Sequence, residues 1–309
     1  MIEHGPTPPH IDPYEGPHAH VACPACGRHR LDAGTATGTV TWVETSRGRN
    51  EWYRCGHCGA YHLHDTYDLD AEVAHTEARP WGQTKAGTEL NDFKRRMFLA
   101  VLRLLEQYQP PPARLLDVGC SFGGFGIEAN RAGYDVHGMD ITPAAVEYVR
   151  SLGLDAQCAS TPADLIGVPD GSIDVVTCLD CNTVWPDQPA QLVAIHAKLR
   201  PGGHLVMRVV DKSWMFTIGR RLRPISPRLA QRVMREAVND GRFTMPVHTL
   251  RRLLDEQGFN VVAISIRAAV HSDQTRWPAR AGFAVGAVLW PLFHRNYGPG
   301  AVLIATRRA

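Results

Sequence analysis

Arg114-Leu-Leu-Asp117-Val-Gly119-Cys-Ser121-Phe-Gly123-Gly124 is the stretch that decides the fold. Its first residues predict a short buried strand, and its glycines predict a tight turn that opens a helix. Such a turn brings free backbone N–H groups to a nucleotide. A second strand, Val136-His-Gly-Met-Asp140, ends in a carboxylate about twenty residues later, the spacing at which an acid accepts both ribose hydroxyls. The two segments predict half of a nucleotide-binding domain.

A glycine-rich turn also occurs in dinucleotide sites, and Gly126 stands where the third glycine of that fingerprint would lie. The dinucleotide alternative therefore stays open. Asp117, however, precedes the first glycine, where its charge would repel a pyrophosphate and attract an ammonium group. The later segments also favour another ligand. They are Cys158-Ala-Ser160, then Val168-Pro-Asp-Gly-Ser-Ile-Asp-Val-Val-Thr-Cys178-Leu-Asp180, then Leu199-Arg-Pro-Gly-Gly-His-Leu-Val-Met207.

These motifs, in this order and over residues 90 to 267, resemble the class I S-adenosylmethionine-dependent methyltransferases. The resemblance implies that Asp117, Gly119, Ser121 and Gly123 surround the methionine moiety of the cofactor and that Asp140 binds the ribose. It also implies that Ile141 packs on the adenine, that Ala159 and Ser160 lie at the adenine edge, and that Leu179 and Asp180 form the floor of the site. Ser121 replaces a common glycine, which we expect to be tolerated if its backbone avoids positive φ. Thr183-Val184 replaces a frequent Glu-His pair, so no catalytic base can be carried over from that pair.

Strands and helices alternate along the chain, which predicts an α/β fold with a Rossmann-like, doubly wound parallel sheet and the ligand at the carboxyl ends of its strands. The last predicted strands are residues 261–267 and 301–306, and the resemblance implies seven strands with the final one antiparallel. An amphipathic core helix is predicted over residues 91–108. Thr142-Pro143 is expected to cap the helix over residues 144–152.

Four of the eight cysteines form two Cys-x-x-Cys-Gly knuckles, at Cys23 and Cys26 and at Cys55 and Cys58. Two such turns place four thiolates around one ion and complete a closed tetrahedral Zn²⁺ site of the structural kind. Residues 39–45 and 51–54 predict a hairpin between the knuckles, which makes a zinc ribbon. Disulfides or free thiols are the alternative, and His57 is expected to face solvent.

The other cysteines are interpreted as packing residues, with Cys120 and Cys158 as small buried side chains near the cofactor. The Cys178-Leu-Asp-Cys181 pair has the knuckle spacing, but it ends an apolar strand on which neighbouring side chains point to opposite faces. We therefore expect neither a metal nor a redox site there.

The predicted organisation is a mobile tail (residues 1–20), the zinc ribbon (21–64), a connector (65–89) and the methyltransferase domain (90–309). The resemblance places the connector over the cofactor cleft. Two segments, 211–245 and 269–299, exceed what the core needs, and their aromatic residues are candidates for a lid over the acceptor: Trp214, Phe216, Trp277, Trp290, Phe293 and Tyr297. The alternative is that these aromatic side chains belong to the core.

Composition agrees with a cytoplasmic enzyme, at 44% hydrophobic and 21% charged residues among 309. A net charge of +2 is too small to require a nucleic acid or an anionic membrane as partner. No signal-peptide pattern opens the chain, and the apolar stretch 281–293 is too short to span a bilayer, although it could rest on a membrane surface or cover an apolar acceptor. The sequence makes no prediction about oligomeric state.

Methyl transfer requires alignment of the acceptor with the methyl group and exclusion of water, and a base only for acceptors such as hydroxyls, carbon acids or protonated amines. Asp180, His248 and His271 are the candidate catalytic residues. Each has an alternative: Asp180 could only bind cofactor, His248 could cap a helix near Thr249, and His271 could be exposed.

A zinc ribbon joined to this core resembles bacterial methyltransferases of sugars, nucleotide-linked sugars and secondary metabolites, which implies a small-molecule acceptor. The first alternative is RNA, because another zinc-ribbon methyltransferase family modifies ribosomal RNA and a set of arginines could touch phosphates: Arg220, Arg221, Arg223, Arg228, Arg232, Arg235, Arg251 and Arg252. Interleaved acidic residues such as Glu236 and Asp255 disfavour RNA. The second alternative is a non-catalytic scaffold that binds the cofactor.

Overall fold

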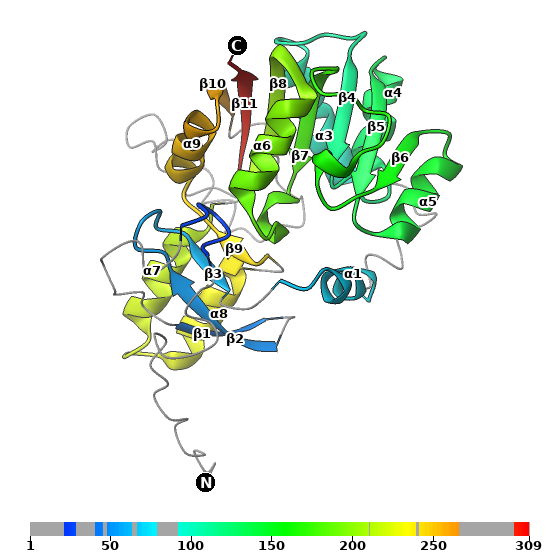
Figure 1. Cartoon of the computed structure of the whole chain (residues 1–309). Helices are drawn as coiled ribbons and strands as arrows, with labels where there is room; N and C mark the ends of the chain where they lie inside the picture. The colour runs from blue at the N-terminus through cyan, green and yellow to red at the C-terminus, as the bar shows by residue number, and fades with distance from the viewer. Residues whose placement is uncertain are drawn as a thin grey trace.

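The computed structural model describes residues 22–28, 41–45, 48–63, 67–78, 92–209, 211–238, 241–265 and 300–308. Within these ranges lie two sheets, with strand orders β10-β11-β8-β7-β4-β5-β6 and β1-β2-β3-β9. The seven-stranded sheet occupies one end of the molecule and the smaller sheet the other (Figure 1). No helix among the described residues combines the length and the apolar character needed to cross a membrane.

The large sheet is mostly parallel, as the alternating strands and helices predict. Its strands are β4 (Arg114–Val118), β5 (Asp135–Asp140), β6 (Asp155–Cys158), β7 (Ile173–Leu179), β8 (Leu199–Val209), β10 (Phe259–Ser265) and β11 (Ala301–Arg307). Strand β11 runs antiparallel to both β8 and β10, between which it lies. The predicted fold class, seven strands with an antiparallel last strand, is therefore confirmed. All parallel strands end at one edge, where the sequence motifs are collected.

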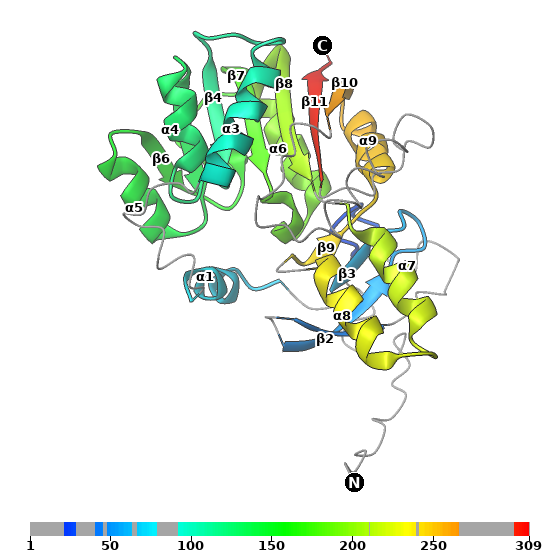
Figure 2. The same ribbon diagram turned by 180° about the vertical axis from the view of Figure 1, so that it is seen from behind.

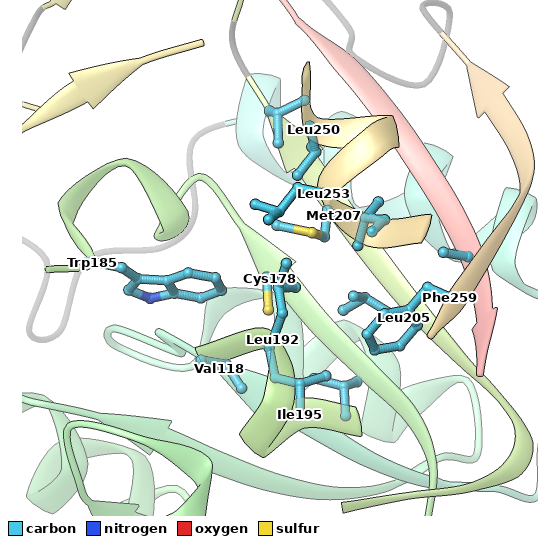
Figure 3. Close-up of a cluster of buried hydrophobic side chains, with 14 of the residues drawn as sticks. Val118, Cys178, Trp185, Leu192, Ile195, Leu205, Met207, Leu250, Leu253 and Phe259 are labelled. Atoms are coloured by element: carbon cyan, nitrogen blue, oxygen red, sulfur yellow. The ribbon is translucent and has the colours of Figure 1, made fainter. Parts of the chain in front are cut away.

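Helices cover both faces of the large sheet, namely α3 (Asp92–Leu105), α4 (Gly124–Arg131), α5 (Pro143–Ser151), α6 (Gln188–Lys198) and α9 (Val247–Glu256). Side chains of β8 alternate between the faces. Leu205 and Met207 pack with Leu192 of α6 and Leu250 of α9, as Figure 3 shows. Val206 packs instead in the cluster that holds residues of α3 and α4. In Figure 1 α6 stands in front of the sheet, whereas in Figure 2 α3 does.

The two helices predicted from local signals both form, with different ends. The amphipathic helix ends at Leu105 rather than at residue 108, and it buries Met97 and Val101. Pro143 takes the first turn of α5 as predicted. Thr142 is the N-cap residue of α5 as predicted, but its hydroxyl is buried without a hydrogen bond and does not bond the first turn. Its backbone N–H donates instead to Asp140 Oδ1 at 2.9 Å, so a carboxylate outside the helix fixes this turn.

The small sheet contains the predicted hairpin, in which β1 (Thr41–Thr45) pairs antiparallel with β2 (Gly48–Arg54). Strand β3 (Tyr61–Leu63) pairs with β2, and on its other side with β9 (Phe243–Thr244). Strand β9 belongs to the segment 211–245, far along the chain. Strands from the N-terminal ribbon and from the segment 211–245 therefore share one sheet. The predicted domain boundaries at residues 64 and 90 stay a prediction.

Two helices of the segment 211–245, α7 (Ser213–Leu222) and α8 (Pro227–Val238), pack on this small sheet (Figure 2). Phe216 stacks on Tyr61 with 4.3 Å between ring centroids and an interplanar angle of 7°. The Phe216 side chain is fully buried beside Trp52. Phe216 is thus a core residue, which agrees with the alternative that the aromatic side chains of this segment belong to the core rather than to a lid. Trp214 is half-buried.

One further helix, α1 (Leu69–Glu77), lies in the predicted connector, with Asp68 accepting a hydrogen bond from the Ala71 N–H at its start. Two short 3₁₀ helices are η2 (Pro162–Asp164) and η3 (Asn182–Val184), and η3 directly follows the β7 motif. The rest of the connector, the tail and the segment 269–299 with its four aromatic candidates lie outside the described residues.

Candidate active site and metal centre

The glycine-rich turn after β4 lies between β5 and the segment after β7. Gly119 N–H donates to the carbonyl of Met139 at 2.7 Å, which ties the turn to β5. Gly119 has φ +73°, and a Cβ added there would lie 2.5 Å from Cys181 Cβ. Both the backbone conformation and the close approach therefore require glycine. The Cys181 thiol donates to the Val118 carbonyl at 3.1 Å, so the turn and the end of β7 form one unit.

Ser121 lies in the same turn with φ +50°, so the condition under which serine was expected to be tolerated, a backbone without positive φ, is not met. The left-handed conformation costs a non-glycine residue roughly 1–2 kcal/mol. Its N–H, however, donates to the Asp140 carboxylate at 2.8 Å, and a hydrogen bond to a charged group contributes about 1.5–3 kcal/mol. The hydrogen bond is large enough to offset the strain, which explains why serine is accepted at this position.

Asp140 lies at the end of β5 and bridges the glycine turn to α5. One carboxylate oxygen accepts from Ser121 N–H and the other from Thr142 N–H. A carboxylate has about four lone-pair positions, so about two stay available for hydroxyl donors. Ile141 beside it is half-buried, and Ala159 N–H donates to the Asp140 carbonyl at 3.0 Å. The structure thus brings these predicted residues together at one edge, whereas Ser160 is exposed and its hydroxyl bonds Asp164.

Asp117 lies one strand away, on β4, and is almost completely buried. Its Oδ1 accepts a hydrogen bond from the Thr177 hydroxyl at 2.6 Å. Burial, with a smaller contribution from the nearby Asp140 charge, raises the pKa of Asp117 to about 7 despite the opposing hydrogen bond from Thr177. In the part of the chain that the structure describes, no basic side chain forms an ion pair with Asp117. A buried carboxyl group with this environment fits the ammonium group of an amino-acid ligand.

Asp180 follows β7 in a left-handed conformation, with φ +68°. Its carboxylate forms an ion pair with Arg208 in which both Oδ atoms accept from the same nitrogen, Nη1. The backbone adds a second link, because Asp180 N–H donates to the Arg208 carbonyl at 3.2 Å. Leu179 pairs with Arg208 across the parallel strands. Sequence reasoning missed Arg208, although a charged residue near the end of a buried strand was a signal for it.

Of the other two catalytic candidates, only His248 is among the described residues. His248 is exposed in the first turn of α9, which begins at Val247, so it does not cap a helix near Thr249. It lies near enough to the buried Asp211 to lower the pKa of that carboxyl, which burial raises overall. His271 lies outside the described residues.

The four knuckle cysteines lie together, with their sulfur atoms all within 4.8 Å of one another. Two of the separations, Cys23 Sγ to Cys58 Sγ and Cys26 Sγ to Cys55 Sγ, are 3.8 Å. A disulfide requires about 2.05 Å, whereas a tetrahedral Zn²⁺ with ligands at about 2.3 Å places its sulfurs roughly 3.8 Å apart. The donor set and its geometry fit structural zinc, and all four cysteines are free of disulfides.

Each knuckle has the local hydrogen bonds expected for a metal turn. Gly27 N–H donates to the Cys23 carbonyl at 2.8 Å, and Gly59 N–H donates to the Cys55 carbonyl at 2.9 Å. Both glycines have positive φ. The Cys58 sulfur accepts from the Ala60 N–H at 3.5 Å. His57 is half-buried and does not belong to the cysteine cluster.

The remaining cysteines divide into three buried or partly buried residues and one exposed residue. Cys178 is fully buried in the main core and Cys120 is buried beside α5. Burial raises the pKa of the Cys120 thiol, with the charges of Asp117 and Asp140 adding to the effect. Cys158 was expected to be buried, and that prediction was wrong: it ends β6 at the exposed sheet edge, where its thiol donates to the Ile141 carbonyl.

Comparison with known proteins agrees with this geometry. The model of the family described as "Methyltransferase domain" matches residues 90–264, more than half of the chain. The chain belongs to this family. It carries a methyltransferase domain with an α/β fold, and a cysteine cluster suited to structural zinc. The match covers the strands from β4 to β8, which carry the glycine turn, Asp140 and Asp180.

Individual relatives of this methyltransferase match over shorter ranges. A ubiquinone biosynthesis O-methyltransferase from Xanthomonas oryzae is 32% identical over 106 residues, 33% of this chain and 44% of the relative. The protein of the same name from Alkalilimnicola ehrlichii is 28% identical over 165 residues, 51% of this chain and 64% of the relative. The methyltransferase therefore spans less than two thirds of the length of these relatives.

Among solved structures, a magnesium protoporphyrin IX methyltransferase from Synechocystis with bound S-adenosylhomocysteine is similar to this chain. Its TM-score is 0.51 at 15% sequence identity, and the alignment covers 78% of this chain and 100% of that one. At this identity the likeness supports the fold of the methyltransferase.

Proposed function

We propose that this methyltransferase transfers the methyl group of S-adenosylmethionine to a hydroxyl oxygen of a small molecule. The observation that carries the proposal is Asp180, an exposed carboxylate beside Cys181, which contacts the glycine turn. It therefore lies next to the edge at which the family binds its cofactor. A hydroxyl acceptor needs a proton acceptor at this place, and the O-methyltransferases among the relatives support the same chemistry.

The cofactor roles that we propose follow from the positions of the side chains. Asp117 would pair with the ammonium group, Asp140 would accept the ribose hydroxyls, and Ile141 and Ala159 would contact the adenine. The bound cofactor supplies an electrophilic methyl group on a positively charged sulfur. The chain itself would orient the acceptor, exclude water and take up the hydroxyl proton at Asp180.

The test is methyl transfer from radiolabelled S-adenosylmethionine to a panel of hydroxylated sugars, nucleotide sugars and phenols, with total bacterial RNA in a parallel reaction. We expect label in a small molecule, with Asp180→Asn lowering turnover by about 10²-fold or more while S-adenosylhomocysteine affinity changes little. Label confined to RNA would overturn the proposal and favour the arginine-bearing helices as the acceptor surface. Cofactor binding without transfer to any acceptor would favour the scaffold.

A further inference from the structure

Arg208 is buried in a way that its observed ion pair does not explain. Its side chain is 9% exposed, whereas that of Asp180 is 42% exposed. Both carboxylate oxygens of Asp180 share one nitrogen, Nη1, and the Nε atom of Arg208 is buried without a hydrogen-bond partner. An unpaired buried donor costs about 1–3 kcal/mol, and more where it carries charge. The fork of donors that a guanidinium offers is therefore only partly used.

The charged groups that follow Arg208 along the chain are already bonded. The Lys212 ammonium donates to the Glu236 carbonyl at 2.8 Å, and burial lowers the pKa of this amine. The closest buried acid in sequence, Asp211, is already occupied, because its two oxygens accept from Ser213 and from Val247 N–H. Asp180 is thus the acid that pairs with Arg208, where the carboxyl ends of β7 and β8 lie side by side.

We propose that Arg208 forms an anion site in which a carboxylate or phosphate group of the acceptor replaces Asp180 on the Arg208 guanidinium. An anion with two oxygens can bond two donors of a guanidinium side by side, which the present pairing through Nη1 alone does not do. The inference rests on the proposed function, because it names the charge that the acceptor of that same site carries.

Replacement of the ion pair would also prepare Asp180 for catalysis. In the observed pair both oxygens of Asp180 accept from the guanidinium, which holds the carboxylate against Arg208. The backbone of Asp180 stays anchored by its N–H to the Arg208 carbonyl, so only the side chain has to rotate. Binding of the anion to Arg208 would therefore release the Asp180 carboxylate, which could then accept the hydroxyl proton.

The chemical step then balances with the groups present. A lone pair of the acceptor oxygen forms the bond to the methyl carbon, the carbon–sulfur bond breaks, and its electron pair stays on sulfur. The hydroxyl proton passes to the Asp180 carboxylate. The products are the methyl ether and neutral S-adenosylhomocysteine, and an acceptor without an anionic group would leave Asp180 bound to Arg208.

Calorimetric titration of the full chain with inorganic phosphate and, separately, with benzoate tests the site, with saturating S-adenosylhomocysteine present. We expect binding of at least one probe, and the stronger probe identifies phosphate or carboxylate as the anion. Asp180→Asn should strengthen binding by about tenfold, because it removes the competing charge and retains Arg208. Arg208→Gln should weaken it by about tenfold or more, whereas Arg103→Gln, an exposed arginine of α3, should leave it unchanged.

Several outcomes would overturn the site. The first is that neither probe binds, in the wild type or in Asp180→Asn. The second is that Asp180→Asn binds the probes no more tightly than the wild type. The third is that a folded Arg208→Gln binds them as tightly as the wild type. If Arg208→Gln does not fold, the comparison of Asp180→Asn with the wild type still decides. The titration does not depend on methyl transfer. Anion binding together with a failed transfer assay would therefore contradict the proposed function and not the anion site.

Discussion

The backbone N–H of Gln188, the first residue of α6, donates to the carbonyl of Pro24 inside the first zinc knuckle at 2.8 Å. The second knuckle has a matching contact, in which the Thr249 hydroxyl of α9 donates to the Cys58 carbonyl at 2.7 Å. Both knuckles also contribute to the main core, through Cys23 and Cys58. The metal centre is therefore packed against the methyltransferase domain rather than carried as a separate module.

Loss of zinc should accordingly be felt beyond the ribbon. In Cys26→Ser we expect loss of bound zinc and faster amide hydrogen exchange at residues 182–190 and 245–250, because the partners of Pro24 and Cys58 lie there. Metal analysis and exchange measured by mass spectrometry check this. Cys158→Ser, at an exposed cysteine outside the cluster, is the matched control. Faster exchange restricted to residues 23–63 would argue for an independent ribbon.

Cofactor affinity should depend on pH through Asp117. Its pKa in the free protein is about 7, and pairing with an ammonium group requires the ionised form. Affinity for S-adenosylhomocysteine should therefore fall by about tenfold per pH unit below that value and level off above it. Asp117→Asn should remove the dependence. Methylthioadenosine, which lacks the amino-acid group, is the control ligand, and an equal pH dependence for it would rule out this role of Asp117.

The same raised pKa should act on folding of the cofactor-free protein. The pKa of this carboxyl is higher in the folded state than its ordinary value of 3.8, so its full contribution to the free energy of unfolding is present below pH 3.8. The contribution is lost as the pH rises through about 7. Thermal unfolding should show a smaller decrease in Tm between pH 4 and about 8 in Asp117→Asn than in the wild type. Identical pH profiles would mean that Asp117 is solvated in the free protein.

Gly119 should be intolerant of substitution for two separable reasons. Gly119→Ala places a methyl group 2.5 Å from Cys181 Cβ and holds alanine at φ +73°. Gly153→Ala pays only the backbone cost, because Gly153 has φ +79° with no atom within 4 Å of an added Cβ. We expect the control to lose about 1–2 kcal/mol of unfolding free energy. Gly119→Ala should lose clearly more, together with cofactor affinity, in denaturant titration and calorimetry.

Phe216 should be essential to the small sheet although it is distant in sequence from β1–β3. Phe216→Ala removes a fully buried ring that stacks on Tyr61, and such truncations cost about 3–5 kcal/mol. Ile225→Ala, an exposed residue 81% accessible in the same segment, should change the unfolding free energy by less than about 0.5 kcal/mol. A similar small effect in both variants would contradict the shared core.

The nucleotide-binding half of the fold could be predicted because its signals are local. A strand, a glycine turn with positive φ and a helix start occupy consecutive residues from 114 to 131, and Asp140 follows at a fixed spacing. The knuckles are local as well, since each turn closes within five residues. The Ser121 conformation was missed because its cost is offset by Asp140, a partner that only the folded chain brings near.

By itself the sequence determined the order of the strands and helices, the position of the glycine turn and the four sulfur ligands, since each depends on neighbouring residues and on periodic burial. Only the tertiary structure decided that β9 joins the ribbon sheet, that Phe216 is core, and that Arg208 meets Asp180. These contacts join residues that are tens to almost two hundred positions apart. Their free energy comes from burial and charge pairing, which arise only once the sheet register has placed the side chains side by side.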